Sequence, residues 1–210
     1  MFPAVGVVIA YVAGSIPFAY LAGRLLRGLD LRTAGSGNLG ATNVYRNLGA
    51  PAAVVVLLLD AAKGAVPVRF LPGALQAGVG DAMVWWSIAY GIAAIAGHAK
   101  PLFLAWRGGG KGVATAAGVF AVLAPGALGL TALVCCVVVA FTRYMSVGSV
   151  TAAAVFPILV WLDRGASPEL WASVAVSLFI CWSHRGNLIR LRAGTELRLF
   201  GGRGAGERRP

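Results

Sequence analysis

The sequence predicts an all-α protein, a polytopic membrane helix bundle with about seven transmembrane helices. The chain of 210 residues is 59% hydrophobic and only 12% charged, whereas a soluble domain carries about 25% charged residues. Apolar runs long enough to cross a bilayer recur from one end to the other. Basic residues gather in alternate connecting segments, which is typical of inner-membrane proteins.

Seven apolar segments correspond to the expected helices, at roughly 2–23, 51–72, 82–98, 113–124, 126–142, 146–162 and 168–183. The first lacks a basic n-region and is longer than the h-region of a signal peptide, so we expect a retained helix that starts outside. The fourth is short for a crossing, which needs about 20 residues. The stretch "LAPGALG" at 123–129 is therefore either a turn between two helices or a kink in one long helix.

The basic residues favour two crossings in 113–142. Only then do all the basic clusters lie on one face of the membrane. These clusters are Arg24, Arg27, Arg32 and Arg46; Lys100, Arg107 and Lys111; Arg143; and the seven arginines from Arg185 to Arg209. The expected topology has the N-terminus outside and the C-terminus in the cytoplasm of a bacterial cell, at its inner membrane. The net charge of +11 is explained by this topology, so it does not indicate nucleic-acid binding.

We expect a single membrane domain over 1–200 and a disordered basic tail over 201–210 that contacts lipid headgroups. Cys135, Cys136 and Cys181 lie in apolar segments without metal-ligand or C-x-x-C spacing, so packing roles are expected. No metal and no cofactor is expected.

The first polar segment is "GSGNLGATNVYR", which has the spacing G-x-G-x-x-G. No strand precedes it, so the dinucleotide-binding interpretation fails. Glycines let the backbone approach a ligand, its N–H groups can form an anion-binding nest, and an arginine fork suits phosphate. The alternative is a glycine-rich turn that opens the second helix. The candidate anion-binding residues are Gly35, Ser36, Gly37, Asn38, Gly40, Thr42, Asn43 and Arg46.

The second polar segment contains "GGGKG", in which Gly112 stands where a nucleotide P-loop has its Mg²⁺-ligating Ser or Thr. Glycines before a lysine at the start of a helix still suit phosphate, because free N–H groups, the helix dipole and a cation converge. His98 is either a base or a residue that orients the loop. The candidates are His98, Gly108, Gly109, Gly110, Lys111 and Gly112.

The third polar segment, "HRGNLIRLRAGTE", follows the last apolar run. His184, Asn187 and Arg190 recur every three residues, so a helix places them roughly along one face. Glu196 lies four residues after Arg192 and could pair with it. In the second apolar segment, Asp60 and Lys63 are expected to pair and to tie that helix to the bundle.

At these motifs the sequence closely resembles the bacterial acyl-phosphate:glycerol-3-phosphate acyltransferase family, over nearly the whole chain. "GSIPFAYLAGR" and "LDAAKGAVPV" also look like family elements. The resemblance implies a site built from Ser36, Asn38, Thr42, Asn43 and Arg46, then His98 and Lys111, then His184, Asn187 and Glu196. Leu39 replaces a usual proline, Lys100 replaces an aromatic residue, and the second motif has one extra glycine.

The resemblance implies that acyl phosphate and glycerol 3-phosphate react, at the membrane lipid boundary, to give lysophosphatidic acid. An acyl phosphate is already activated, and the sequence offers no evident Ser-His-Asp arrangement. The H-x-x-x-x-D motif of other glycerolipid acyltransferases is absent, because Phe103 and Ile189 occupy its fifth position after His98 and His184. We therefore expect direct attack, with the proton passing to the departing phosphate, His184 or Glu196. The alternatives are a small-anion transporter, an inactive relative and a membrane scaffold.

Overall fold

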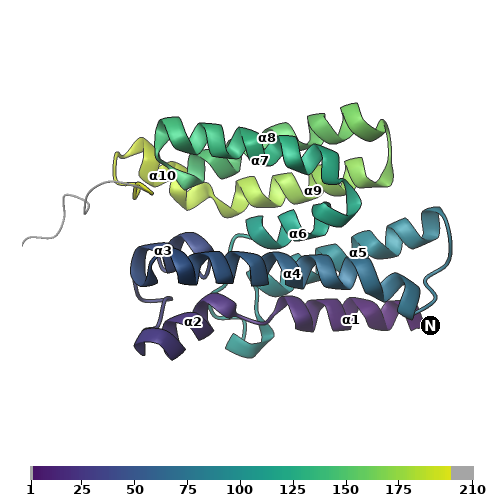
Figure 1. Ribbon diagram of the computed structural model, residues 1–210, viewed down its shortest axis with the longest axis horizontal. Coiled ribbons are helices and arrows are strands. Elements are labelled where there is room, and N and C mark those ends of the chain that lie inside the picture. Colours follow the sequence, from purple (N-terminus) through teal and green to yellow (C-terminus); the bar gives the residue numbers. More distant parts are fainter. Residues whose placement is uncertain (1, 200–210) are drawn as a thin grey trace, which may run out of the picture.

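The computed structural model describes residues 2–199, and every regular element within them is a helix (Figure 1). The all-α prediction is therefore confirmed for this part of the chain. The expected tail over 201–210 lies outside it. In order, the elements are α1 (Phe2–Gly14), α2 (Phe18–Arg27), α3 (Ala41–Leu48), α4 (Ala50–Ala74), α5 (Asp81–Ala99), the short 3₁₀ helix η1 (Leu102–Leu104), α6 (Val113–Leu123), α7 (Pro125–Thr142), α8 (Met145–Arg164), α9 (Pro168–Ser183) and α10 (Arg185–Arg192).

The expected apolar segments are all helical, but the first is not one helix. The chain leaves the helical conformation at Ser15–Pro17 and restarts as α2. Pro17 lacks the N–H group that a continuous helix requires at that position. Phe2–Arg27, Asp81–Leu104, Pro125–Thr142 and Met145–Arg164 are long and apolar enough to span a membrane. The number of crossings stays a prediction.

The stretch "LAPGALG" is a turn between two helices. α6 ends at Leu123, Ala124 leaves the helical conformation with φ −148° and ψ 65°, and α7 begins at Pro125. Proline suits the first position of a helix because its missing N–H would have no partner there. The kinked-helix alternative is thereby excluded.

The helices form two groups that run along the long axis of the molecule, with α6 between them (Figure 1). α1 and α4 pack on α5, α7 and α9 pack on α8, and α4 also packs on α6. The short helices α2, α3 and α10 gather at the end opposite the N-terminus. This arrangement brings the first and third polar segments to the same end of the bundle.

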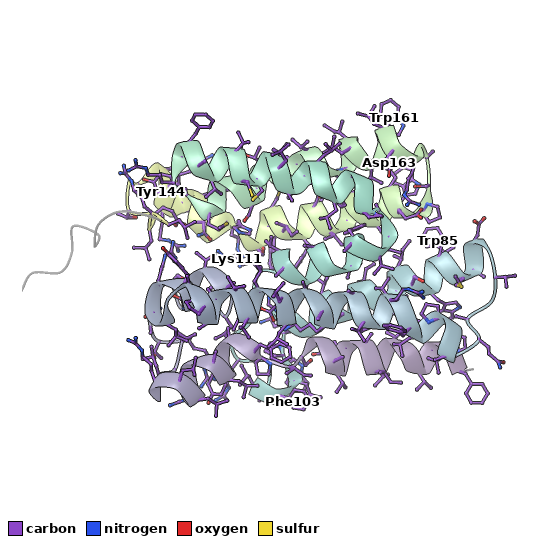
Figure 2. The ribbon with its side chains drawn as sticks, in the orientation of Figure 1. Trp85, Phe103, Lys111, Tyr144, Trp161 and Asp163 are labelled. Atoms are coloured by element: carbon purple, nitrogen blue, oxygen red, sulfur yellow. The ribbon has the colours of Figure 1, made fainter. Side chains whose placement is uncertain are left out.

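Large apolar side chains face outward along the helices. Phe141 is 86% exposed and Leu178 is 66% exposed, and Figure 2 shows Trp85 and Trp161 on the periphery. Buried Phe120 and Phe156 meet edge to face in the interior. An apolar exterior around an apolar core is stable where lipid replaces water as the solvent.

Small residues let α4 and α6 approach closely. A Cβ atom added to Gly118 would collide with the carbonyl oxygen of Ala61, and one added to Gly64 would collide with that of Thr115. Close backbone approach at small residues is the usual way in which membrane helices associate.

We predict that Gly118→Ala destabilises the protein, because neither helix backbone can yield without moving the other. Overpacking of this kind costs about 1–3 kcal/mol, and in a protein of this size each kcal/mol lowers Tm by roughly 2–4 °C. Thermal unfolding in detergent measures the effect. Gly129→Ala on α7 is the matched control, because its Cβ would meet nothing within 4 Å. Equal Tm values for the two variants would contradict the packing argument.

Candidate functional site

A cavity of about 400 Å³ opens between the two groups of helices and is reached by all three polar segments. Figure 2 shows Lys111 between these groups. Eleven of the predicted residues line it: Ser36, Asn38, Gly40, Thr42, Arg46, His98, Lys111, Gly112, His184, Asn187 and Glu196. The remaining wall is largely apolar and includes Val54, Leu57, Val113 and Met145.

Asn43 organises the first polar segment rather than facing the cavity. It is fully buried. Its Oδ1 accepts a hydrogen bond from the Ser36 N–H at 3.0 Å, and its Nδ2 donates to the carbonyl oxygens of Leu31 and Ala34 at 3.1 and 3.0 Å. Gly35 and Gly37 have φ values of +59° and +70°, which few other residues adopt. These three predicted residues therefore shape the loop that presents Ser36.

The three glycines before Lys111 in the second polar segment also shape their loop rather than face the cavity. Gly108, Gly109 and Gly110 do not line the cavity. The Gly110 N–H donates to the His98 carbonyl at 3.1 Å, and the Gly109 carbonyl accepts from the Leu39 N–H of the first segment at 3.2 Å. Their packing leaves Lys111 and Gly112 at the cavity wall, immediately before the N-terminus of α6.

A series of hydrogen bonds joins the second and third segments. The Lys111 ammonium donates to Asn187 Oδ1, and Asn187 Nδ2 donates to Glu196 Oε1 at 2.6 Å. Ser146 Oγ on α8 donates to the same carboxylate oxygen at 3.0 Å, and Arg190 Nε donates to Glu196 Oε2 at 2.9 Å. The side chain of Glu196 is only 5% exposed.

The expected pairing of Glu196 with Arg192 is wrong, because Glu196 pairs with Arg190. α10 ends at Arg192, Gly194 adopts a φ of +70°, and the Thr195 N–H returns to the Arg190 carbonyl at 2.8 Å. This turn replaces the helical spacing on which the expectation depended. Arg190 does not line the cavity, so it holds Glu196 rather than facing the cavity.

Burial lowers the pKa of three basic groups that line the cavity, Lys111, Arg46 and His184. It lowers the pKa of Lys111 to about 8. It also lowers the pKa of Arg46, but the guanidinium stays charged. Burial, aided by the Lys111 charge, lowers the pKa of His184 to about 4. At neutral pH Lys111 and Arg46 therefore carry positive charge, and the His184 imidazole is neutral.

A backbone carbonyl fixes one side of the His184 ring and one side of the Arg46 guanidinium. His184 Nδ1 lies 2.8 Å from the Ile180 carbonyl; because a carbonyl only accepts, Nδ1 carries the proton and Nε2 is left as an acceptor. An Arg46 terminal nitrogen donates to the Leu197 carbonyl at 2.9 Å. Its buried Nε has no hydrogen-bond partner within residues 2–199. Such an orphaned donor beside a cavity suits an oxygen-rich anion.

Sequence analysis missed two residues of this site. Ser146 begins an apolar helix and carries no motif, so only its contact with Glu196 reveals it. Asp60 pairs with Lys63 at 2.8 Å, as expected, but it also lines the cavity.

Residues 4–194 match the protein family described as "Glycerol-3-phosphate acyltransferase". The chain belongs to this family. A relative of that name in Synechococcus sp. (strain CC9902) is 45% identical over 192 residues, which cover 91% of this chain and 92% of that one. Another, in Myxococcus xanthus (strain DK1622), is 46% identical over 196 residues and covers 91% and 97%.

The fold is also similar to two solved structures of PlsY (YgiH), an integral membrane glycerol 3-phosphate acyltransferase. Its glycerol 3-phosphate form has a TM-score of 0.85 and 35% identity, covering 95% of this chain and 96% of that one. Its lysophosphatidic acid form has a TM-score of 0.83 and 34% identity, covering 95% of each chain. The membrane-bundle prediction and the family resemblance are both confirmed, and the transporter alternative is disfavoured.

We predict that phosphate binding weakens above pH 8. The pKa of Lys111 is about 8, so its ammonium loses a proton, and the cavity loses a cation, as the pH rises through that value. If binding requires the charged form, affinity falls by up to about tenfold per pH unit beyond it. Equilibrium dialysis with labelled inorganic phosphate between pH 7 and 9.5 measures the fall. Lys111→Arg, which stays charged, should flatten the profile; an unchanged slope would contradict the assignment.

Proposed function

We propose that this protein transfers a fatty acyl group from acyl phosphate to the sn-1 hydroxyl of glycerol 3-phosphate, producing lysophosphatidic acid for phospholipid synthesis. One observation carries the proposal. Arg46 and Lys111, 65 positions apart in the sequence, face a single cavity that is lined by both polar and apolar side chains. Two phosphate-bearing substrates, one of them with a fatty chain, match a cavity that offers both cations and apolar side chains.

The proposed roles follow the geometry. Arg46 and Lys111 bind the phosphate groups, and Ser36, Asn38 and Thr42 supply neutral contacts beside them. The N-terminus of α6 adds N–H groups and the positive end of its dipole. Asn187 and Glu196 orient the Lys111 ammonium.

His184 has a separate proposed role, because its Nε2 can accept a hydrogen bond from the glycerol hydroxyl. The acyl chain lies along Val54, Leu57 and Met145 toward the surrounding membrane lipid.

The chemistry is a direct acyl transfer. The glycerol oxygen forms a bond to the acyl carbon, and the bond from that carbon to the phosphate oxygen breaks. No acyl-enzyme is needed, because phosphate is already a good leaving group. Positioning and charge stabilisation then supply the rate.

The departing phosphate is the best-supported proton acceptor. His184, with a pKa of about 4, is a weak base at neutral pH. Both Glu196 oxygens accept hydrogen bonds from neighbouring side chains. The leaving phosphate has no such constraint and sits beside the hydroxyl that it must deprotonate.

We further propose seven crossings, one membrane domain over 1–200 and a bacterial inner-membrane location. The basic residues of the polar segments support a cytoplasmic site. Both proposed substrates carry phosphate and do not cross a bilayer unaided, so a site open to the cytoplasm also suits their supply.

Purified protein given acyl phosphate and glycerol 3-phosphate should release inorganic phosphate and form lysophosphatidic acid in equal amounts. A parallel reaction with acyl-CoA distinguishes the donors, and we expect turnover with acyl phosphate alone. Turnover with acyl-CoA alone would overturn the proposed donor, although the protein would still be an acyltransferase. Failure with both donors would overturn the acyltransferase proposal.

We predict that Arg46→Ala and Lys111→Ala each lower kcat/KM by about 10²–10³-fold, the usual loss on removing one preorganised charge-stabilising group. Arg27→Ala is the matched control: it removes one positive charge from the exposed end of α2, away from the cavity. All three proteins should elute as folded monodisperse species in detergent. Near-normal rates for Arg46→Ala or Lys111→Ala would refute the phosphate-binding roles.

A further inference from the structure

A buried carboxylate forms part of the cavity wall. Asp60, on α4, is 1% exposed and lines the cavity. Lys63 Nζ lies 2.8 Å from its Oδ1, and His98 Nδ1 lies 3.6 Å from the same atom. Neither oxygen has a hydrogen bond of normal geometry within the described residues. An ionisable group at such depth in a membrane protein is costly, and it usually has a function.

Lys63 supplies the positive charge that balances this carboxylate. Its ammonium contacts Asp60 and also donates to the Ile16 carbonyl at 2.9 Å, where the chain breaks between α1 and α2. The two opposite charges balance each other, and the hydrogen bond to Ile16 fixes the ion pair to the chain just after α1. A structural ion pair is complete without any further partner, so the approach of His98 to Asp60 needs a separate explanation.

His98 connects Asp60 to the second polar segment. It lies in the last turn of α5 and is 6% exposed, and it lines the cavity. Its Nδ1 faces Asp60, while its Nε2 lies against Gly110, where a Cβ atom would collide with the ring. The His98 carbonyl accepts the Gly110 N–H at 3.1 Å. Ring and backbone of one residue thus both contact the residue before Lys111.

We propose that Asp60 is a positioning residue for acyl transfer: it fixes the orientation and the Nδ1–H tautomer of His98, and through His98 the loop that carries Lys111. The inference rests on the proposed acyltransferase function. A carboxylate only accepts, so the ring nitrogen that faces it carries the proton. Nε2 is then left with its lone pair toward Gly110. An imidazole in the other tautomer would lose its attraction to Asp60 and would turn, displacing the Gly110 backbone and the ammonium beside it.

Histidine NMR tests the tautomer without any activity measurement. The chain has only two histidines, and His98→Asn assigns the signals of ¹⁵N-histidine-labelled protein. We expect His98 in the unaltered protein to be protonated at Nδ1 and not at Nε2. Protonation at Nε2 alone would overturn the proposal, whatever the enzyme does.

Kinetics of Asp60→Asn test the positioning role. The amide keeps the shape of the side chain but can donate to Nδ1, which favours the Nε2–H tautomer of His98. We expect kcat to fall by at least about tenfold, with a smaller change in KM, in protein that stays folded. Thr115→Val is the matched control, because it also alters a buried polar side chain beside α4, but one whose hydroxyl has no hydrogen-bond partner among residues 2–199.

A double variant distinguishes positioning from simple stabilisation. If Asp60 acts through His98, Asp60→Asn/His98→Asn should be no slower than His98→Asn alone. Independent effects that multiply would overturn the proposal, as would normal kcat in the folded fraction of Asp60→Asn. If Asp60→Asn does not fold, Asp60→Asn/Lys63→Met removes both charges of the pair and takes its place. An inactive unaltered enzyme would instead refute the proposed function and leave the tautomer result standing.

Discussion

The series of hydrogen bonds from Lys111 through Asn187 to Glu196 is the interaction on which the site depends. It joins a loop that precedes α6 to the turn that follows α10, and Ser146 extends it to α8. Without these bonds, a half-buried ammonium and a buried carboxylate would face each other unsupported. Burial of one unpaired charge costs several kcal/mol, so the contacts fix both side chains at the wall of the cavity.

The same burial that requires these partners also gives the cavity its chemical character. It brings the pKa of Lys111 near physiological pH and keeps His184 neutral. Arg46 remains the permanent cation, and its buried Nε has no hydrogen-bond partner within residues 2–199. A site with this arrangement suits an anion and offers little general base. That combination suits a reaction in which the leaving group is itself a phosphate.

Sequence patterns predicted the helices and the polar residues of this site, because hydropathy and loop charge reflect local constraints. They could not distinguish glycines that touch a ligand from glycines that fit against His98, since that depends on packing between α5 and a distant loop. The Glu196 partner was missed because Gly194 reverses the chain. Asp60 was expected to pair with Lys63, but its approach to the cavity depends on the crossing of α4 and α5.

The most direct test of this account is an experimental structure of the protein with glycerol 3-phosphate bound. We expect the phosphate between the two groups of helices, within hydrogen-bond distance of Arg46 and of the Lys111 ammonium. The glycerol hydroxyl should point toward His184 and the apolar wall. A phosphate held by the peripheral arginines of α2 or α10, with the cavity unchanged, would contradict the central claim.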